Sequence, residues 1–276
     1  MKKFTIAAIP YSIYALIFFV APLILVLFYS VTGPDGAFTL ENFARFFDFD
    51  KPVYMLALWR SVYLAVISTI ICLLLGYPMA YILSKLSPRV RGFLSLLFVL
   101  PMWMNFLLRT YAWMTLLEKT GIINTFLERL GLPALNIMYT EGAIILGNVY
   151  NFLPFMILPI YTVLIKIDHS VIEAAQDLGA NGMHVFFRVI IPLSLPGVMS
   201  GISMTFMPAV TTFIISRLLG GGKTAMIGDL IENQFKVVGD WGFGSAMSVI
   251  IMVMILFAMH FMSNYEKEQA EGGLLL

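Results

Sequence analysis

The sequence predicts an all-α polytopic membrane protein with six transmembrane helices. Of its 276 residues, 60% are hydrophobic and 12% are charged, whereas soluble globular chains carry about 25% charged residues. A single aqueous domain of this length cannot bury so much apolar surface, so lipid must be part of its solvent. The net charge of +1 includes no basic run of the kind that binds nucleic acid.

Six apolar segments reach or nearly reach the length of about 20 residues that crosses a bilayer as a helix. Because backbone groups in hydrocarbon must be paired within their own segment, we expect each segment to be a helix. The first exceeds a signal-peptide core and no small-x-small cleavage site follows it, so we expect it to be retained within one transmembrane domain, 1–276. The segments are 10–31, 61–86, 92–117, 142–165, 193–216 and 245–263.

Two short acid-free stretches indicate the orientation. Lys2 and Lys3 precede the first segment, and the connection after the second holds Lys85, Arg89 and Arg91. Cytoplasmic loops are enriched in Lys and Arg. Over all loops the two faces carry equal numbers of basic residues, so the short stretches decide. We expect the cytoplasmic face to hold both termini, 86–91 and 166–192, and the outer face to hold 32–60, 118–141 and 217–244.

The stretch LLGGGKTAMIG, residues 218–228, is only superficially similar to a phosphate-binding loop. A P-loop requires a glycine five positions before its Gly-Lys pair, and here that position is Arg217. No strand pattern precedes it, and the expected topology places it outside the cell. We therefore expect a turn that leads to an outer amphipathic segment, 226–238.

The longest cytoplasmic loop, 166–192, predicts a helical knob. Ser170 followed by Glu173 has the spacing of a capping box, which predicts that a helix begins there. Gly179 can end that helix in a left-handed conformation. A second short helix is expected after the turn, and Pro192 is expected to start the next membrane helix at a fixed angle.

This loop resembles the EAA loop of the permease subunits of bacterial ATP-binding-cassette (ABC) importers. The matching elements are Glu173-Ala174-Ala175, Gly179 and Val189-x-Ile191-Pro192, where the family pattern has Ile and Leu in place of Val189 and Ile191. The resemblance implies that the knob docks on an ATPase subunit, with Glu173 as its anchor and Gly179 as its turn. The expected coupling residues are Glu173, Ala174, Ala175, Asp177, Gly179, Ala180 and Asn181, of which Asp177, Ala180 and Asn181 are included because they flank the turn.

Further stretches are similar to the spermidine/putrescine type of these importers, and specifically to the PotB-like subunit. They are FTLENFARFF (38–47), LGYPMAYILSK (75–85), LPMWMNFLLRTYAWMTLL (100–117), GIINTFLERLGL (121–132) and the loop from 218 onward. The resemblance implies the type I importer fold, with a five-helix core and an N-terminal helix, in a bacterial inner membrane. It implies four kinds of partner: a second related permease, two ATPase subunits that hold ATP and magnesium, an extracytoplasmic binding protein, and lipid. No cofactor is expected on this chain.

None of the six segments contains an acidic residue in its interior, so a cationic cargo would depend on aromatic faces and amides. Candidates for the pathway lining are Trp103, Asn105, Tyr111, Trp113, Tyr150, Asn151 and Thr205. Helix packing or an interfacial aromatic belt is the competing interpretation. Arg109 is costly inside a membrane, so we expect it to pair with a carbonyl or an acid and to face away from the path.

Other functions fit less well. Another importer cargo, such as sulfate, ferric iron or phosphonate, stays open, since an oxyanion would suit Arg109. An ion-coupled secondary transporter usually has intramembrane carboxylates and an inverted repeat, and neither is visible here. An intramembrane serine protease would need glycine where Val198 stands, and no HExxH metal motif is present. We therefore expect a non-catalytic subunit.

Overall fold

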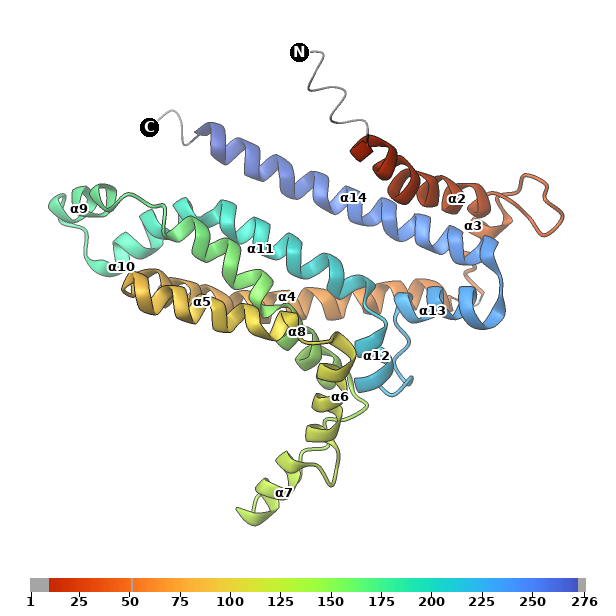
Figure 1. The fold of residues 1–276 in the computed structure, drawn as a ribbon, viewed down its shortest axis with the longest axis horizontal. Helices are drawn as coiled ribbons and strands as arrows, with labels where there is room; N and C mark the ends of the chain where they lie inside the picture. The colour runs from red at the N-terminus through yellow and green to blue at the C-terminus, as the bar shows by residue number, and fades with distance from the viewer. Residues whose placement is uncertain (1–9, 51, 273–276) are drawn as a thin grey trace. The chain divides into compact units, whose positions relative to one another are not determined.

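Helices account for all the regular elements in the described residues, 10–50 and 52–272, of this computed structural model (Figure 1). The all-α prediction is confirmed. Pairing of β type is limited there to one isolated bridge between Thr32 and Phe38. In chain order the helices are η1 (Leu16–Val20), α2 (Ala21–Ser30), α3 (Glu41–Phe46), α4 (Val53–Lys85), α5 (Pro88–Trp103), α6 (Phe106–Leu117), α7 (Ile122–Arg129), α8 (Glu141–Leu164), α9 (His169–Asp177), α10 (Gly182–Val185), η2 (Phe186–Ile190), α11 (Ile191–Thr211), α12 (Ile214–Leu219), α13 (Ile227–Asn233), η3 (Gln234–Val238) and α14 (Trp241–Gly272).

Five stretches of helix are long and apolar enough to cross a membrane. They are Pro10–Ser30, Val53–Lys85, Glu141–Leu164, Gly182–Thr211 and Trp241–Met262. Each overlaps an expected segment, although α4 begins eight residues earlier than expected. The helix that overlaps the expected segment 193–216 begins eleven residues earlier and ends five residues earlier, at Thr211. Apolar composition predicts which residues cross the membrane, whereas capping residues decide where a helix begins and ends. The ends of a helix therefore need not coincide with the ends of its apolar segment.

The remaining expected segment, 92–117, is not one straight helix. It is broken between Trp103 and Phe106, and the stretches Pro88–Trp103 and Phe106–Arg129 meet there at a bend of 92°. Asn105 explains the break, because its side-chain oxygen accepts hydrogen bonds from the backbone N–H groups of Leu107 and Leu108 and so starts a new helix. The expectation of a continuous third helix is therefore corrected to a bent pair, α5 and α6.

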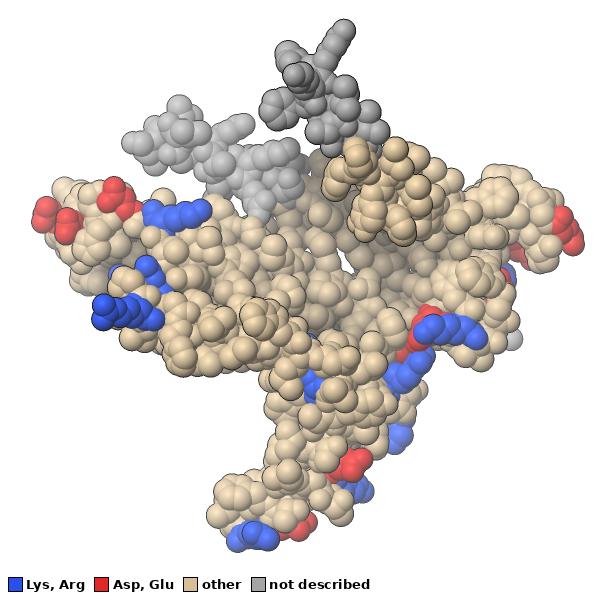
Figure 2. Space-filling model, viewed as in Figure 1, with Lys and Arg blue, Asp and Glu red and all other residues tan. Residues whose placement is uncertain are grey.

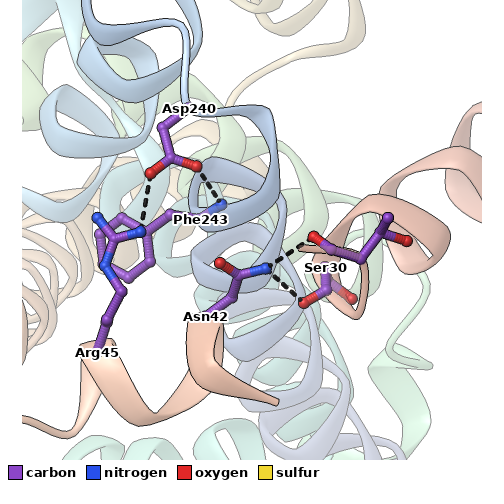
Figure 3. Close-up of polar contacts among 6 residues, drawn as sticks. Ser30, Asn42, Arg45, Asp240 and Phe243 are labelled. Carbon is purple, nitrogen blue, oxygen red and sulfur yellow. Dashed lines mark hydrogen bonds and ion pairs between the residues drawn. The ribbon is translucent and has the colours of Figure 1, made fainter. Parts of the chain in front are cut away.

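The chain divides into two compact units. Among the described residues, unit 1 comprises 10–50, 52–58 and 227–257 and has a small apolar core around Phe46, Phe243 and Met247. At its edge, the Asn42 side chain donates to the backbone carbonyls of Ser30 and Thr32, each at 3.2 Å (Figure 3). These bonds join the end of α2 to α3.

An ion pair in unit 1 joins α3 to the start of α14 (Figure 3). The Arg45 guanidinium lies 2.8 Å from the Asp240 carboxylate and 4.2 Å from the centre of the Phe243 ring. Burial opposes ionisation of Asp240, but the Phe243 N–H and Arg45 outweigh it and hold the pKa of that carboxyl below its ordinary value.

Among the described residues, unit 2 comprises 59–226 and 258–272, and its core is built around α8. Helix α11 packs directly on α8 because two glycines remove side chains from the seam. A methyl group on Gly197 would lie 2.9 Å from the Pro159 carbonyl oxygen, and one on Gly201 would lie 2.8 Å from the Met156 sulfur. Small residues on this helix therefore permit the close packing.

The α8–α11 seam gives a test of this packing. Gly197→Ala is expected to lower stability by about 1–3 kcal/mol, because the added methyl meets backbone atoms that cannot move aside. Its control is Gly92→Ala, where no atom lies within 4 Å of the added methyl, and alanine favours a helix by up to about 1 kcal/mol. Thermal unfolding in one detergent measures both. A destabilising Gly92→Ala together with a neutral Gly197→Ala would contradict the described seam.

Candidate coupling loop and pathway residues

Helix α9 begins two residues earlier than the capping box predicted. The N-cap is Asp168, whose carboxylate accepts a hydrogen bond from the Ser170 N–H at 3.0 Å. That hydrogen bond holds the pKa of Asp168 below its ordinary value. Glu173 does not close a capping box, since it lies 3.1 Å from the His169 ring instead. The prediction of Ser170 as the cap is wrong because Asp is an equally good capping residue and lies where the chain turns.

The end of α9 is a Schellman motif, as the glycine predicted. Gly179 has φ +86°, the left-handed region in which glycine has no steric penalty. The Ala180 N–H donates to the Ala175 carbonyl at 3.0 Å, and the Gly179 N–H donates to that of Gln176 at 2.8 Å. These are the two bonds that define the motif. The prediction of a left-handed Gly179 is confirmed.

After the turn, the chain enters one long helix. Asn181 caps it by accepting a hydrogen bond from the His184 N–H at 2.9 Å, and helix continues from Gly182 to Thr211. Pro192 was expected to start a new helix and instead lies inside this one. The π-helical turn η2 ends just before it, and there the Ile191 N–H donates to the Phe186 carbonyl. Such a turn lets the helix continue past Pro192, which has no backbone N–H to donate.

The loop from 166 to 192 therefore forms a knob that is anchored on one side and exposed on the other. Ile172, Ala175 and Ala180 pack against the core of unit 2. Leu178, at the end of α9, is 90% exposed, and Met183, in α10, is 71% exposed. Glu173, Ala174, Asp177, Gly179 and Asn181 are also exposed, and Ala175 and Ala180 are half-buried.

Sequence reasoning missed Leu178 and Met183. In the sequence, Leu178 comes directly before the predicted helix-ending Gly179, and Met183 comes two residues after the cap Asn181. Large apolar side chains that are exposed at a helix end are candidates for contact with another protein.

The pathway candidates fall into two groups. Trp103, at 75% exposure, Asn105 and Tyr111 are exposed around the α5–α6 bend. Asn151 on α8 and Thr205 on α11 are buried, at 2% and 0% exposure, and these two helices pack on each other. Asn105 is used as a helix cap.

Trp113 and Tyr150 are half-buried, and their rings meet edge to face with centroids 5.1 Å apart. They line an apolar hollow of about 420 Å³ together with Ile71, Val149 and Leu153, among others.

Arg109 closes the inner side of the bend. It is only 7% exposed, and its guanidinium donates to the Pro101 carbonyl near the end of α5. The same group lies 5.7 Å from the ring centres of Phe106 and Tyr150. The expected contact of Arg109 with a carbonyl is confirmed, and that carbonyl belongs to α5, the helix before the bend.

The glycine-rich stretch is a turn that packs on a neighbouring loop. Gly221 has φ +61°, and a side chain there would meet the Tyr139 ring at 2.3 Å. The Tyr139 N–H donates to the Leu219 carbonyl at 2.9 Å. The glycines therefore serve close approach between two loops, which agrees with the expected turn.

A model of the family described as binding-protein-dependent transport system inner membrane component matches residues 72–269. The chain belongs to this family. The match includes α9, the Gly179 turn and the α5–α6 bend, so the described site lies within the family's common region. The chain is thus a multi-pass membrane permease subunit of an ABC importer.

Relatives of this permease agree in sequence and in fold. The chain is 41% identical over 254 residues to the spermidine/putrescine transport system permease protein PotB of Haemophilus influenzae, with 88% of each chain covered. It is 41% identical over 220 residues to PotB of Escherichia coli K12, with 79% of each covered. The predicted PotB-like resemblance is confirmed.

A solved structure shares the fold at low identity. The crystal structure of a bacterial ABC transporter involved in import of the acidic polysaccharide alginate matches at a TM-score of 0.78 and 18% identity. The match covers 95% of this permease and 96% of that chain. The importer-permease fold predicted from the sequence is therefore confirmed.

Arg109 gives a test of the bend. In Arg109→Leu the Pro101 carbonyl loses its charged donor, so the angle between α5 and α6 is expected to vary more widely. Spin labels at Phe93 and Phe126, in a Cys72→Ala background, report this by double electron–electron resonance as a broader distance distribution.

The matched control for this test is Tyr111→Leu, an exposed change on the same helix. It is expected to leave the distribution as in the parent. Equal distributions for the parent and Arg109→Leu would show that Arg109 does not hold the bend.

Proposed function

We propose that this permease forms half of a translocation pathway for spermidine, putrescine and related polyamines, driven by ATP hydrolysis in partner subunits. The support for the cargo is the 41% identity to PotB proteins over most of both chains. The alginate importer shares the fold at 18% identity, so fold likeness alone does not select the cargo.

The knob supports the proposed coupling, and the exposed Leu178 is the observation that carries it. A leucine at 90% exposure next to a rigid Schellman turn is an apolar tip suited to a groove on another protein. The rest of the knob is fixed to unit 2 through Ile172, Ala175 and Ala180. We propose that this tip docks on an ATPase subunit, and that ATP and magnesium are bound there and not by this permease.

The proposed assembly contains a second related permease, two ATPase subunits and an extracytoplasmic binding protein. The acid-free stretches that carry Lys85, Arg89 and Arg91 support an orientation with both termini and α9 in the cytoplasm. The α6–α7 region and the loop after α12 then face outward.

For the pathway itself, the exposed aromatics at the α5–α6 bend are the favoured lining. Trp103 and Tyr111 are accessible, and their ring faces attract organic cations. Asn151 and Thr205 lie inside the helix packing, so they are not proposed to touch cargo. Arg109 is buried and already bonded to the Pro101 carbonyl, so its position gives no support to an anionic cargo.

The experiment is uptake of labelled spermidine by proteoliposomes that contain the permease with its co-expressed partner subunits. Uptake is expected to require ATP and the binding protein. Gly179→Ala forces a side chain into the left-handed region at a cost of about 1–2 kcal/mol, so uptake per ATP hydrolysed is expected to fall. Gly179→Asn is the matched control, since asparagine tolerates that conformation, and it is expected to retain more coupled uptake.

The possible negative results of this uptake experiment reject different parts of the proposal. ATPase activity stimulated by another solute, without spermidine uptake, would keep the importer and reject the cargo. Spermidine uptake by this chain alone, driven by an ion gradient, would reject the importer mechanism. Equal coupling in Gly179→Ala and Gly179→Asn would reject the role of the turn.

A further inference from the structure

A basic surface lies where α4 ends and α5 begins. Lys85 is the last residue of α4, and Arg89 and Arg91 lie in the first turn of α5. No acidic residue lies between these positions or in that first turn. We call these three residues the basic connection. Lys85 and Arg89 are exposed, and Arg91 is half-buried.

The charge of the basic connection is not balanced within the part of the chain that the structure describes. None of its three side chains takes part in an ion pair there. The Lys85 ammonium lies 5.4 Å from the centre of the Tyr81 ring, a contact that leaves the charge in place. Figure 2 shows blue basic side chains at the end of unit 2 where α5 begins, apart from the red acidic ones over α9.

Large apolar side chains adjoin these charges on the same two helices. Phe93 is 62% exposed on α5, and Ile82 is 60% exposed on α4, with Val90 exposed between the two arginines. Both helices belong to candidate membrane spans. Charged heads directly beside exposed apolar side chains are typical of the boundary between hydrocarbon and head groups, where long basic side chains reach toward the phosphate layer.

We propose that the basic connection binds the head group of an anionic phospholipid whose acyl chains lie against Phe93 and Ile82. Arginine pairs with phosphate through two parallel N–H donors, and basic pockets at the ends of membrane helices bind anionic head groups. A lipid fits better than a water-soluble protein surface, because a single lipid molecule has a phosphate that can pair with Arg89 and acyl chains that can contact the apolar Phe93 beside it. The exposed tip of α9, which carries Leu178, Glu173 and Asp177, has the opposite charge character.

The test is native mass spectrometry of the complete importer in a neutral detergent, titrated with phosphatidylglycerol or with phosphatidylcholine. Arg89→Gln is expected to weaken phosphatidylglycerol binding about fivefold. The double variant Arg89→Gln with Arg91→Gln is expected to weaken it by about fivefold for each of the two charges removed. Phosphatidylcholine binding is expected to stay unchanged. Arg89→Lys keeps the charge and is expected to retain most of the affinity.

Lys119→Gln with Arg129→Gln is the matched control, since it removes two exposed basic residues of unit 2 outside the basic connection. Phosphatidylglycerol affinity in the Arg89/Arg91 variant equal to that in the control would overturn the proposal. Loss of the ATPase subunits from that variant, with lipid affinity intact, would also overturn it and assign the surface to a protein contact. Arg89 is exposed, so its single variant keeps the test valid if the double variant fails to assemble.

Discussion

The close contact between α11 and α8 is the constraint on which the rest of the structure depends. Gly197 and Gly201 bring the two helices near enough that an added methyl would meet atoms at 2.8–2.9 Å. Helix is continuous from Gly182 to Thr211, so the segment that leaves the knob is the same one that packs on α8. Because packed interiors resist deformation, a displacement of the knob would be passed to the core of unit 2 and not absorbed by a loop.

The same core explains why polar residues fall into different roles. Asn151 on α8 and Thr205 on α11 are buried, and these two helices pack on each other. The α5–α6 bend leaves that packing and exposes Trp103 at its apex. Arg109 is bonded on the inner side of the bend, which supplies a fixed charge without presenting it to a cationic cargo. The exposed Trp103 and the buried Arg109 therefore lie on different sides of the bend.

Much of this arrangement could be predicted from the sequence, because long apolar segments and the Glu173–Gly179 pattern depend on local residues. The break at Asn105 was also encoded locally, by a capping residue four positions after Pro101, but continuous hydrophobicity concealed it. The start of α9 was misplaced because Asp168 and Ser170 are both good caps. Burial of Asn151 and Thr205 depends on helices distant in the sequence, so no local pattern could separate them from Trp103 and Tyr111.

The central claim is that the tip of α9 transmits force between this permease and an ATPase subunit. Photocrosslinking tests it most directly, with benzoylphenylalanine at Leu178 in the assembled importer and, as a control, at Leu130, which is also exposed at the end of α7. A crosslink to the ATPase is expected from position 178 and none from position 130. A crosslink to the ATPase from position 130 alone would contradict both the proposed orientation and the role of the knob.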